Sequence, residues 1–430
     1  MIRTVPLSDL LPGAGPRVQL QQGWSPQCLA HPAPETSWGV LKTTAIQSGE
    51  FVPHENKELP EHFEPRPGLE VRAGDLLLTC AGPRSRCGIP ALVRTTRPRL
   101  MISGKMYRFR PDPDAVDSRY LELYLQSPAA QTLIDAMKTG ISDSGLNLTK
   151  ERFLGLPVPV VPLPEQRRIV DILEDHLSRL DAANDYLDAT SRRIELLRRA
   201  WLREALPSAI PTDEAYTISE AIIDSRGGWS RSRKHIVDGA LGVPYLKMNN
   251  ISPSGVLDLD EVVRVEATAQ DVARYGLEVG DVLFNSKNSG DLVGKTAVAD
   301  SRVRGWVLNE NIMRLRFDGR LDPRFVGLWF LGPAMRSHIM EAASASTNVA
   351  AVYMHALKDF PLWIPSRTIQ ERLVSEHEEL QRDNRELLGS VIANGRRSRR
   401  LRAALLSAAF SGHLTGHASE MERVEELAFS

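Results

Sequence analysis

The sequence of 430 residues has few of the features that mark secreted, membrane or fibrous proteins. Its three cysteines, Cys28, Cys80 and Cys87, are an odd number without a C-x-x-C pair, so we expect no disulfide framework and a reducing, cytoplasmic setting. The apolar runs are short and broken by proline, and the first residues lack the apolar stretch of a secretory signal. We therefore expect no membrane span.

Charge is balanced, with 53 Lys and Arg against 54 Asp and Glu and a formal net charge of −1. The chain therefore lacks the overall basic excess that marks many nucleic-acid-binding proteins, and any such binding must come from a local surface. A hydrophobic share of 42% with 25% charged residues is typical of a globular protein, and this length suits two or three domains.

Catalytic and metal-binding motifs are also missing. Segment 289–296, SGDLVGKT, has Ser289 where a phosphate-binding loop requires glycine, and His377 lacks the second histidine of H-E-x-x-H, so we interpret it as a helix-packing residue. No Pro-Pro dipeptide occurs, so the loop with which amino-methyltransferases hold a target base is absent, and there is no G-x-S-x-G. We interpret Cys80 and Cys87 as buried thiols and expect no catalytic residue, metal or cofactor.

The sequence repeats itself at an interval of about 205 residues. Gly23-Trp24-Ser25 recurs as Gly228-Trp229-Ser230, Leu41-Lys42 as Leu246-Lys247, and the run that begins at Gly74-Asp75 recurs at Gly280-Asp281. Near the end of each half, LPVPVVPLPEQRRIV (156–170) matches FPLWIPSRTIQERLV (360–374). Four matches in the same order indicate an internal duplication.

Each half reads as a globular unit followed by a long helix. Strand-like runs at 75–80, 91–96, 281–286 and 294–299 accompany helical patterns at 118–137 and 323–343. This mixture predicts an α/β (α+β) domain that occurs twice in tandem.

Two segments have the character of long helices. From Pro164 to Leu206 there is no interior proline or glycine, and apolar residues recur in steps of four and three, which predicts a heptad seam. A second helix should begin at the capping box Thr368–Glu371 and end near residue 411, with a kink or break near Gly395. The predicted seam residues are Ile169, Leu173, Leu180, Leu187, Ile194, Leu197, Leu373, Leu380, Leu387, Val391, Leu401 and Leu405.

Both helices are mainly acidic in their first half and rich in arginine in their second half. The helix dipole alone favours this order. An antiparallel pair would also set the acidic half of each helix against the basic half of the other, whereas a parallel pair would set like against like. We therefore predict that two similar domains are separated by an antiparallel coiled coil, with a pseudo-twofold internal repeat.

In this organisation the sequence resembles the specificity subunit of type I restriction–modification enzymes. The resemblance rests on residues 156–169, LPVPVVPLPEQRRI, on their counterparts through Gln370-Glu371-Arg372, on the Gly-Asp runs at 74 and 280, and on LLSAAFSGHL at 405–414. It covers about residues 1–414. Its specificity lies in the order and duplication of these segments.

The resemblance implies two target recognition domains (1–162 and 207–365), a central spacer helix (163–206), a C-terminal spacer helix (366–412) and a tail (413–430). Each domain would read one half of a bipartite, asymmetric site in double-stranded DNA. The helices would separate the domains and dock two methyltransferase subunits, which restriction (motor) subunits join. S-adenosylmethionine, ATP and magnesium would belong to those partners, so this chain would be a non-catalytic subunit.

Side chains that read bases must reach the groove edges, Arg or Lys for guanine and Asn or Gln for adenine. We expect equivalent loops in the two halves, 42–44 with 247–250 and 80–88 with 284–295, although phosphate contact or plain solvation stays open for each residue. Trp24 and Trp229 are interpreted as framework aromatics. The candidate DNA-binding residues are Lys42, Thr43, Thr44, Arg84, Ser85, Arg86, Lys105, Arg231, Arg233, Lys234, Lys247, Asn249, Asn250, Ser286, Lys287, Asn288 and Lys295.

Two other functions stay open. The chain could be a scaffold whose two domains bind protein partners without touching DNA, in which case apolar patches should replace the Asn, Lys and Arg of the loops. It could also be an enzyme with a site between the halves, but the ten histidines show no clustered spacing.

Overall fold

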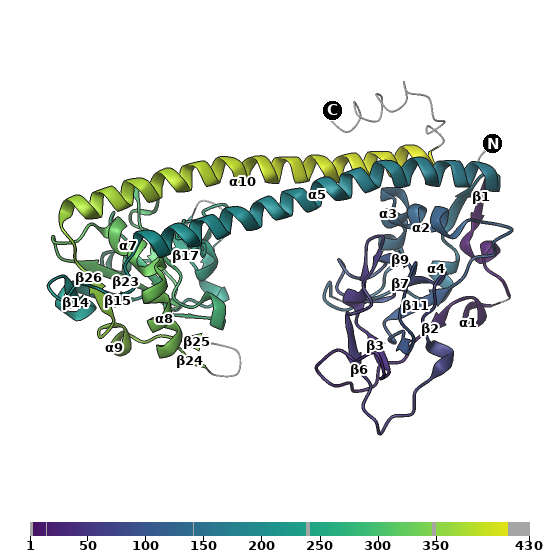
Figure 1. Cartoon of the computed structure of the whole chain (residues 1–430), viewed down its shortest axis with the longest axis horizontal. Coiled ribbons are helices and arrows are strands. Elements are labelled where there is room, and N and C mark those ends of the chain that lie inside the picture. Colours follow the sequence, from purple (N-terminus) through teal and green to yellow (C-terminus); the bar gives the residue numbers. More distant parts are fainter. Residues whose placement is uncertain (1–2, 14, 141, 238–240, 346–349, 412–430) are drawn as a thin grey trace. The chain divides into compact units, whose positions relative to one another are not determined.

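The computed structural model describes residues 3–13, 15–140, 142–237, 241–345 and 350–411. The chain divides into two compact units: unit 1 is Met1–Asp188 with Ile392–Ser430, and unit 2 is Ala189–Val391. Each long helix contributes residues to both units (Figure 1). The predicted tail at 413–430 lies outside the described residues.

Unit 1 is built on a four-stranded antiparallel sheet in the order β2-β11-β7-β9. A second sheet, β10-β3-β6, contains the parallel pair β10/β3, and three strand pairs, β1-β13, β12-β8 and β4-β5, complete the unit. The strands are β1 Arg3–Pro6, β2 Gln21–Gln22, β3 Gly39–Leu41, β4 Ile46–Gln47, β5 Glu50–Phe51, β6 Asn56–Glu58, β7 Leu76–Thr79, β8 Ala81–Gly82, β9 Pro90–Leu92, β10 Leu100–Met101, β11 Met106–Phe109, β12 Leu146–Asn147 and β13 Pro157–Val160.

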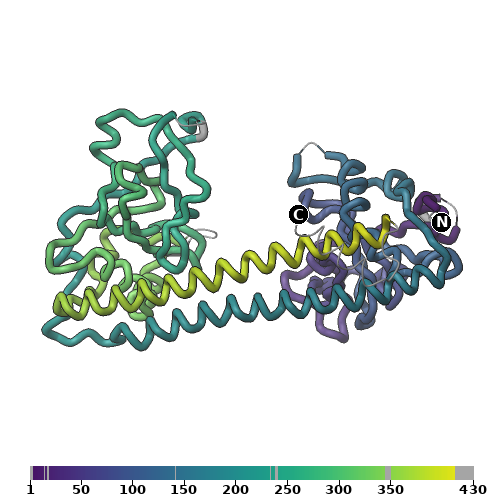
Figure 2. The backbone as a smooth tube through the Cα atoms, turned by 90° about the horizontal axis from the view of Figure 1, so that it is seen from above, coloured from purple at the N-terminus to yellow at the C-terminus, as the bar shows by residue number. Residues whose placement is uncertain are grey.

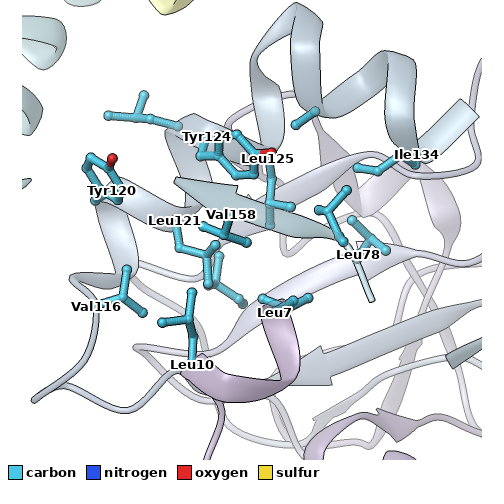
Figure 3. Close-up of a cluster of buried hydrophobic side chains, with 14 of the residues drawn as sticks. Leu7, Leu10, Leu78, Val116, Tyr120, Leu121, Tyr124, Leu125, Ile134 and Val158 are labelled. Carbon is cyan, nitrogen blue, oxygen red and sulfur yellow. The ribbon is translucent and has the colours of Figure 1, made fainter. Parts of the chain in front are cut away.

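The main core of unit 1 lies between this sheet and its helices. Leu78 of the sheet lies near Leu125 of one helix and Ile134 of the next, all buried (Figure 3). The core continues into the first turns of the long helix α5 and the last turns of α10. The helices are α1 Pro16–Gln19, α2 Ser118–Gln126, α3 Pro128–Met137, α4 Lys150–Leu154 and α5 Leu163–Ala205.

Unit 2 has a four-stranded antiparallel sheet in the order β15-β23-β19-β21. The sheet β16-β18-β17-β22 contains the parallel pair β17/β22, and β20-β25-β24 and β14-β26 complete the unit. The elements are β14 Ala215–Thr217, β15 Ile222–Gly227, β16 Ile236–Val237, β17 Val243–Leu246, β18 Val263–Val265, α6 Ala269–Tyr275, β19 Val282–Asn285, β20 Lys287–Asn288, β21 Thr296–Val298, β22 Val307–Leu308, β23 Ile312–Phe317, α7 Pro323–Leu331, α8 Pro333–Ala342, β24 Ser344–Ala345, β25 Ala350–Ala351, α9 Met354–Leu357, β26 Pro361–Trp363 and α10 Arg367–Phe410.

The mixed α/β fold expected from the sequence is confirmed, and several elements correspond between the units. The strand-like runs at 75–80 and 281–286 become β7 and β19, which lie inside their sheets. Each predicted helical pattern, however, is two helices, α2 with α3 and α7 with α8. The breaks come before Pro128 and Pro333, because proline pushes the preceding residue out of helical geometry, and Ser127 and Gly332 are extended.

Both long helices form within one residue of their predicted starts. The predicted break near Gly395 is wrong, because α10 is continuous from Arg367 to Phe410. A Cβ atom added at Gly395 would meet no atom closer than Arg399 Nη1 at 3.8 Å, so no close contact forces the helix to bend there. The cost of glycine, about 1 kcal/mol relative to alanine, is too small to break a helix supported on both sides.

Within each unit the two long helices contact one another. In unit 1, Arg402 of α10 forms an ion pair of 2.7 Å with Asp181 of α5, and Phe410 packs edge-on against Tyr120 and Tyr124 of α2. In unit 2, His377 of α10 stacks on Trp201 of α5, with ring centroids 5.4 Å apart. Figure 2 shows the two helices side by side in each unit.

The buried stripe of these helices differs in part from the predicted seam. Leu197 and Leu387 are 55% and 50% exposed, so they are not part of the stripe, and Leu177, Arg198 and Leu202 are buried instead. A straight helix of 3.6 residues per turn drifts away from a strict seven-residue repeat. The helix ends also pack on the globular parts. Of the other predicted residues, Ile169, Leu173, Ile194, Leu373 and Leu405 are buried, and Leu180, Leu187, Leu380, Val391 and Leu401 are half-buried.

His377 makes the stability of unit 2 dependent on pH. Burial, with a smaller contribution from the charge of Arg198, lowers the pKa of His377 to about 4. The unfolded chain therefore takes up a proton below about pH 6.5, whereas the folded chain does so only near pH 4. Above pH 6.5 this residue should not lower the free energy of unfolding. As the pH falls toward 4, the free energy of unfolding should decrease progressively, by roughly 3 kcal/mol in total.

The matched substitution is His377→Leu, because Leu173 occupies the equivalent buried position in unit 1. Denaturant unfolding between pH 7.5 and pH 4 should show a shallower loss of stability for His377→Leu than for the natural chain. The control His338→Leu changes an exposed histidine and should leave the slope unchanged. Parallel pH profiles for the natural chain and His377→Leu would contradict the assignment.

Candidate nucleic-acid interface

A buried aspartate anchors the central strand that leads into each candidate loop. Asp75 accepts hydrogen bonds from the Arg72 N–H (2.7 Å) and Arg110 Nε (2.6 Å). Asp281 accepts equivalent bonds from the Glu278 N–H (2.8 Å) and Arg316 Nε (2.5 Å). The preceding glycines, Gly74 and Gly280, have φ of 88° and 93°, which favours glycine at the turn. The strand ends are therefore held in the same way in both units.

In unit 1 a half-buried arginine joins the two candidate loops. Arg86 donates to the carbonyl oxygens of Thr43 and Ile46 and to Gln47 Oε1 (3.2 Å), so loops 42–47 and 80–88 lie side by side. These contacts hold the guanidinium against the loop backbone, and its role as a DNA-reading candidate stays a prediction. The carbonyl oxygen of Thr43 accepts one of these hydrogen bonds, and the side chain of Thr43 is half-buried.

The other candidates of unit 1 lie at the surface. Lys42 pairs with Glu55 at 2.7 Å, and hydrogen bonds from Lys42 and Thr44 lower the pKa of that carboxyl. Arg84 pairs with Asp135 (2.7 Å) and Asp143 (3.0 Å). Ser85 and Lys105 are exposed. Exposed ion pairs contribute little to stability, so these cations can exchange their partners for phosphates.

In unit 2 a lysine makes the corresponding connection. Lys295 Nζ donates to the carbonyl oxygen of Met248 at 2.6 Å and joins loop 247–250 to loop 284–295. Burial lowers the pKa of Lys295. Two further candidates are buried. Asn250 donates to the carbonyls of Asp258 and Glu261 and accepts from the Lys247 N–H. Ser286 is buried against the carbonyl of Asn311.

Several of the polar candidates of unit 2 remain accessible. Asn249 and Lys234 are exposed, Lys247 and Lys287 are half-buried, and Asn288 donates to Asn285 Oδ1 at 2.6 Å. β20, Lys287–Asn288, pairs with β25. The surface therefore offers amide and ammonium groups, the types that bind base edges and phosphates.

The last candidates lie beside Trp229. The Arg231 guanidinium stacks 3.2 Å from the centroid of the Trp229 ring, which stacks in turn on Tyr275 with an interplanar angle of 2°. Arg231 is therefore part of a packed cation–π stack. Trp24 in unit 1 packs against Phe63 and Arg66, so both tryptophans belong to the framework. The side chain of Arg233 lies outside the described residues.

Sequence reasoning missed one residue at this surface. Tyr353, 50% exposed, lies two residues after β25 and occupies the N-cap of α9 without a side-chain capping bond. Its counterpart Thr149 caps α4 by accepting from the Arg152 N–H. Aligning the two halves residue by residue pairs Thr149 with Tyr353, and an aromatic residue in a capping position is the signal that could have marked it.

The described part of the chain contains no group of three His, Cys, Asp or Glu side chains arranged as metal ligands would be. Cys80 and Cys87 are buried, and desolvation raises the pKa of Cys80 to about 12. Gly290–Leu292 form a short 3-10 helix whose N-cap is Ser289, the position at which a phosphate-binding loop requires glycine. Within the same described ranges, no helix is long and apolar enough to span a bilayer.

Comparison with known families agrees with this geometry. Residues 91–187 match the family described as type I restriction modification DNA specificity domain. The specificity subunit of type I restriction enzyme EcoEI from Escherichia coli is 38% identical over 174 residues, which are 40% of this chain and 29% of that protein. The StySPI specificity subunit from Salmonella potsdam is 22% identical over 397 residues, 87% of this chain and 82% of that protein.

A solved structure shares the fold. A chain from the study "Structural basis underlying complex assembly and conformational transition of the type I R-M system" is 20% identical, with a TM-score of 0.64 over 95% of this chain and 97% of that chain.

Residues 91–187 thus match a DNA specificity domain, and the chain shares its fold with a solved type I R-M structure. More closely, the chain is similar to specificity subunits of type I restriction enzymes. The matched segment spans only 29% of the EcoEI subunit.

The role of Arg86 can be separated from DNA reading by its effect on stability. Arg86→Ala would leave the Thr43 and Ile46 carbonyls without their donor and should lower the free energy of unfolding by about 1–3 kcal/mol. Hydrogen exchange should then speed up at residues 42–47. Arg84→Ala, two residues away and exposed, should leave unfolding almost unchanged. Equal stability of the two variants would show that Arg86 does not hold the loop.

Proposed function

We propose that this chain is the DNA-recognition subunit of a type I restriction–modification complex and reads a bipartite, asymmetric site, one half per globular domain. The observation that carries the proposal is that two equivalently anchored strands, β7 and β19, lead into loops held by the same kind of contact but lined by different side chains. A shared scaffold with different loop residues is what two different half-sites require.

The repeated framework supports two readers of one kind. The sheets β2-β11-β7-β9 and β15-β23-β19-β21 have the same order, and both units carry a parallel pair and a closing pair between their first and last strands. We take this as the product of an internal duplication. The proposed domains are 1–162 and 207–365, with spacer helices at 163–206 and 366–412.

The helix contacts support an antiparallel coiled-coil spacer. In unit 1 the first half of α5 meets the second half of α10 through Asp181 and Arg402. In unit 2 the second half of α5 meets the first half of α10 through Trp201 and His377. These contacts support a pairing in which the acidic half of each helix faces the basic half of the other. A rod of this kind would keep the two half-sites at a constant separation.

Partners follow from the same proposal. Two methyltransferase subunits would dock on the spacer helices, and restriction subunits would join that complex. S-adenosylmethionine, ATP and magnesium would be bound by those subunits. A formal net charge of −1 predicts that the chain alone binds DNA weakly and in a salt-sensitive way, with the methyltransferase subunits supplying much of the contact to phosphates.

Exchange of one domain tests the proposal. Replacing residues 1–162 by the equivalent domain of a relative should change one half of the motif methylated by the assembled methyltransferase complex, and should leave the other half and the gap unaltered. Sequencing of methylated host DNA reads out both halves at once. The reciprocal exchange of residues 207–365 is the matched control and should change only the second half.

Other outcomes would decide for a different function. If the complex forms but methylates without any motif that depends on this chain, the chain is a protein-binding scaffold. If a single exchange alters both halves together, the two domains do not read separately.

A further inference from the structure

Gln166 and Gln370 occupy the first turns of the two long helices, where each helix leaves its globular domain. They are equivalent in the aligned segments PLPEQRR and SRTIQER, and the side chain of each is fully buried, with 0% of its surface exposed. A buried carboxamide must satisfy one acceptor and two donor positions, so its hydrogen bonds fix its orientation.

Each glutamine uses both ends of its carboxamide in the same way. Gln166 Oε1 accepts from the Asp117 N–H at 2.8 Å, and Nε2 donates to the carbonyls of Val161 (2.8 Å) and Ala115 (3.4 Å). In unit 2, Gln370 Oε1 accepts from the Asp322 N–H at 2.8 Å. Its Nε2 donates to the carbonyls of Pro365 and Arg320, both at 2.9 Å.

The partner of each carboxamide is a helix cap. Asp117 is the N-cap of α2 and Asp322 the N-cap of α7, and each carboxylate accepts from the backbone N–H two residues on, at 2.9 Å. The backbone N–H of the N-cap residue itself is not used by the helix and is taken by the glutamine. The carboxamide therefore ties the first turn of the long helix directly to the N-terminus of the domain helix.

A second, exposed connection repeats around the first. Arg119 Nη1 lies 3.2 Å from Glu174 of α5, and Arg324 Nη1 lies 3.3 Å from Glu378 of α10. Around both connections, apolar side chains such as Val170 and Val374 fill the contact. Apolar contact is not directional, whereas a hydrogen bond weakens steeply when its angle changes. The buried carboxamides thus resist rotation of a domain about its helix.

We propose that Gln166 and Gln370 are positioning residues that fix the rotational phase at which each domain presents its reading loops. The inference rests on the proposed function, because the rotational phase of a domain about its helix affects recognition only if the two domains read one duplex. Each extra base pair between half-sites turns the far half by roughly 35° and moves it by about 3.4 Å. A domain free to turn on its helix would accept gaps that a fixed domain rejects.

The test uses the assembled methyltransferase complex and three DNA duplexes that differ only in the gap: the preferred length, one base pair shorter and one longer. A misplacement of this size should cost the natural complex about a hundredfold in methylation rate. Gln166→Leu and Gln370→Leu remove the hydrogen bonds and keep a buried side chain of similar size. Each should lower the preference for the correct gap at least tenfold, while base preference within both half-sites stays unchanged.

The matched control is Gln131→Leu. Gln131 of α3 also donates from its carboxamide to two carbonyls, those of Gly88 (3.0 Å) and Leu125 (2.7 Å), but these contacts lie inside the domain and away from α5. Gln131→Leu should destabilise the domain and keep the gap preference of the natural complex. If Gln166→Leu lowers activity on all three duplexes equally, as the control should, the positioning role is refuted.

Should Gln166→Leu fail to fold, Gln166→Glu keeps the acceptor oxygen for the Asp117 N–H and replaces the two N–H donors by at most one O–H, so it must still relax the gap preference. An unchanged preference in a folded Gln166→Glu complex would equally overturn the inference. A natural complex that shows no gap preference at all would instead refute the proposed function, so the two failures can be told apart.

Discussion

Gln166 and Gln370, buried where the long helices begin, each make three hydrogen bonds: one to the N-cap of a domain helix, one to a carbonyl two residues before that cap, and one to a carbonyl two residues before the long helix itself. The apolar contact around them supplies most of the free energy of association but sets no angle. The orientation of each domain's loops therefore depends on a few directional hydrogen bonds at the start of its long helix. This dependence explains why the hydrogen bonds around Gln166 and Gln370 are alike in the two units while the loop side chains differ.

Within each domain, a cationic side chain holds two loops together instead of extending from the surface. Arg86 and Lys295 both bind backbone carbonyls of the neighbouring loop, and Asn250 and Ser286 are buried in support of it. The side chains left at the surface, such as Asn249 and Lys287, therefore belong to loops whose backbone is held in place. Preorganised loops of this kind lose less conformational entropy on binding than mobile ones, which favours discrimination between sequences.

Much of the fold could be predicted from the sequence, because local signals mark it. Proline and glycine mark the ends of the long helices, and the Gly-Asp turns come directly before the central strands of both units. The direction of a polar side chain in a loop has no such signal, so the loop contacts of half-buried Arg86 and the burial of Asn250 could not be predicted. The seam was displaced at Leu197 and Leu387 because the sequence does not show which faces the globular parts cover. Gln166 marked the repeat, but its three partners lie in segments up to 51 positions away.

Base-by-base substitution of a methylated duplex tests the central claim most directly. Each pair in and around the recognised sequence is changed in turn, and the methylation rate of the assembled complex is measured. The account predicts two short blocks of intolerant positions with different sequences, separated by a gap of constant length in which every substitution is accepted. A single continuous block, or uniform tolerance across the duplex, would contradict it.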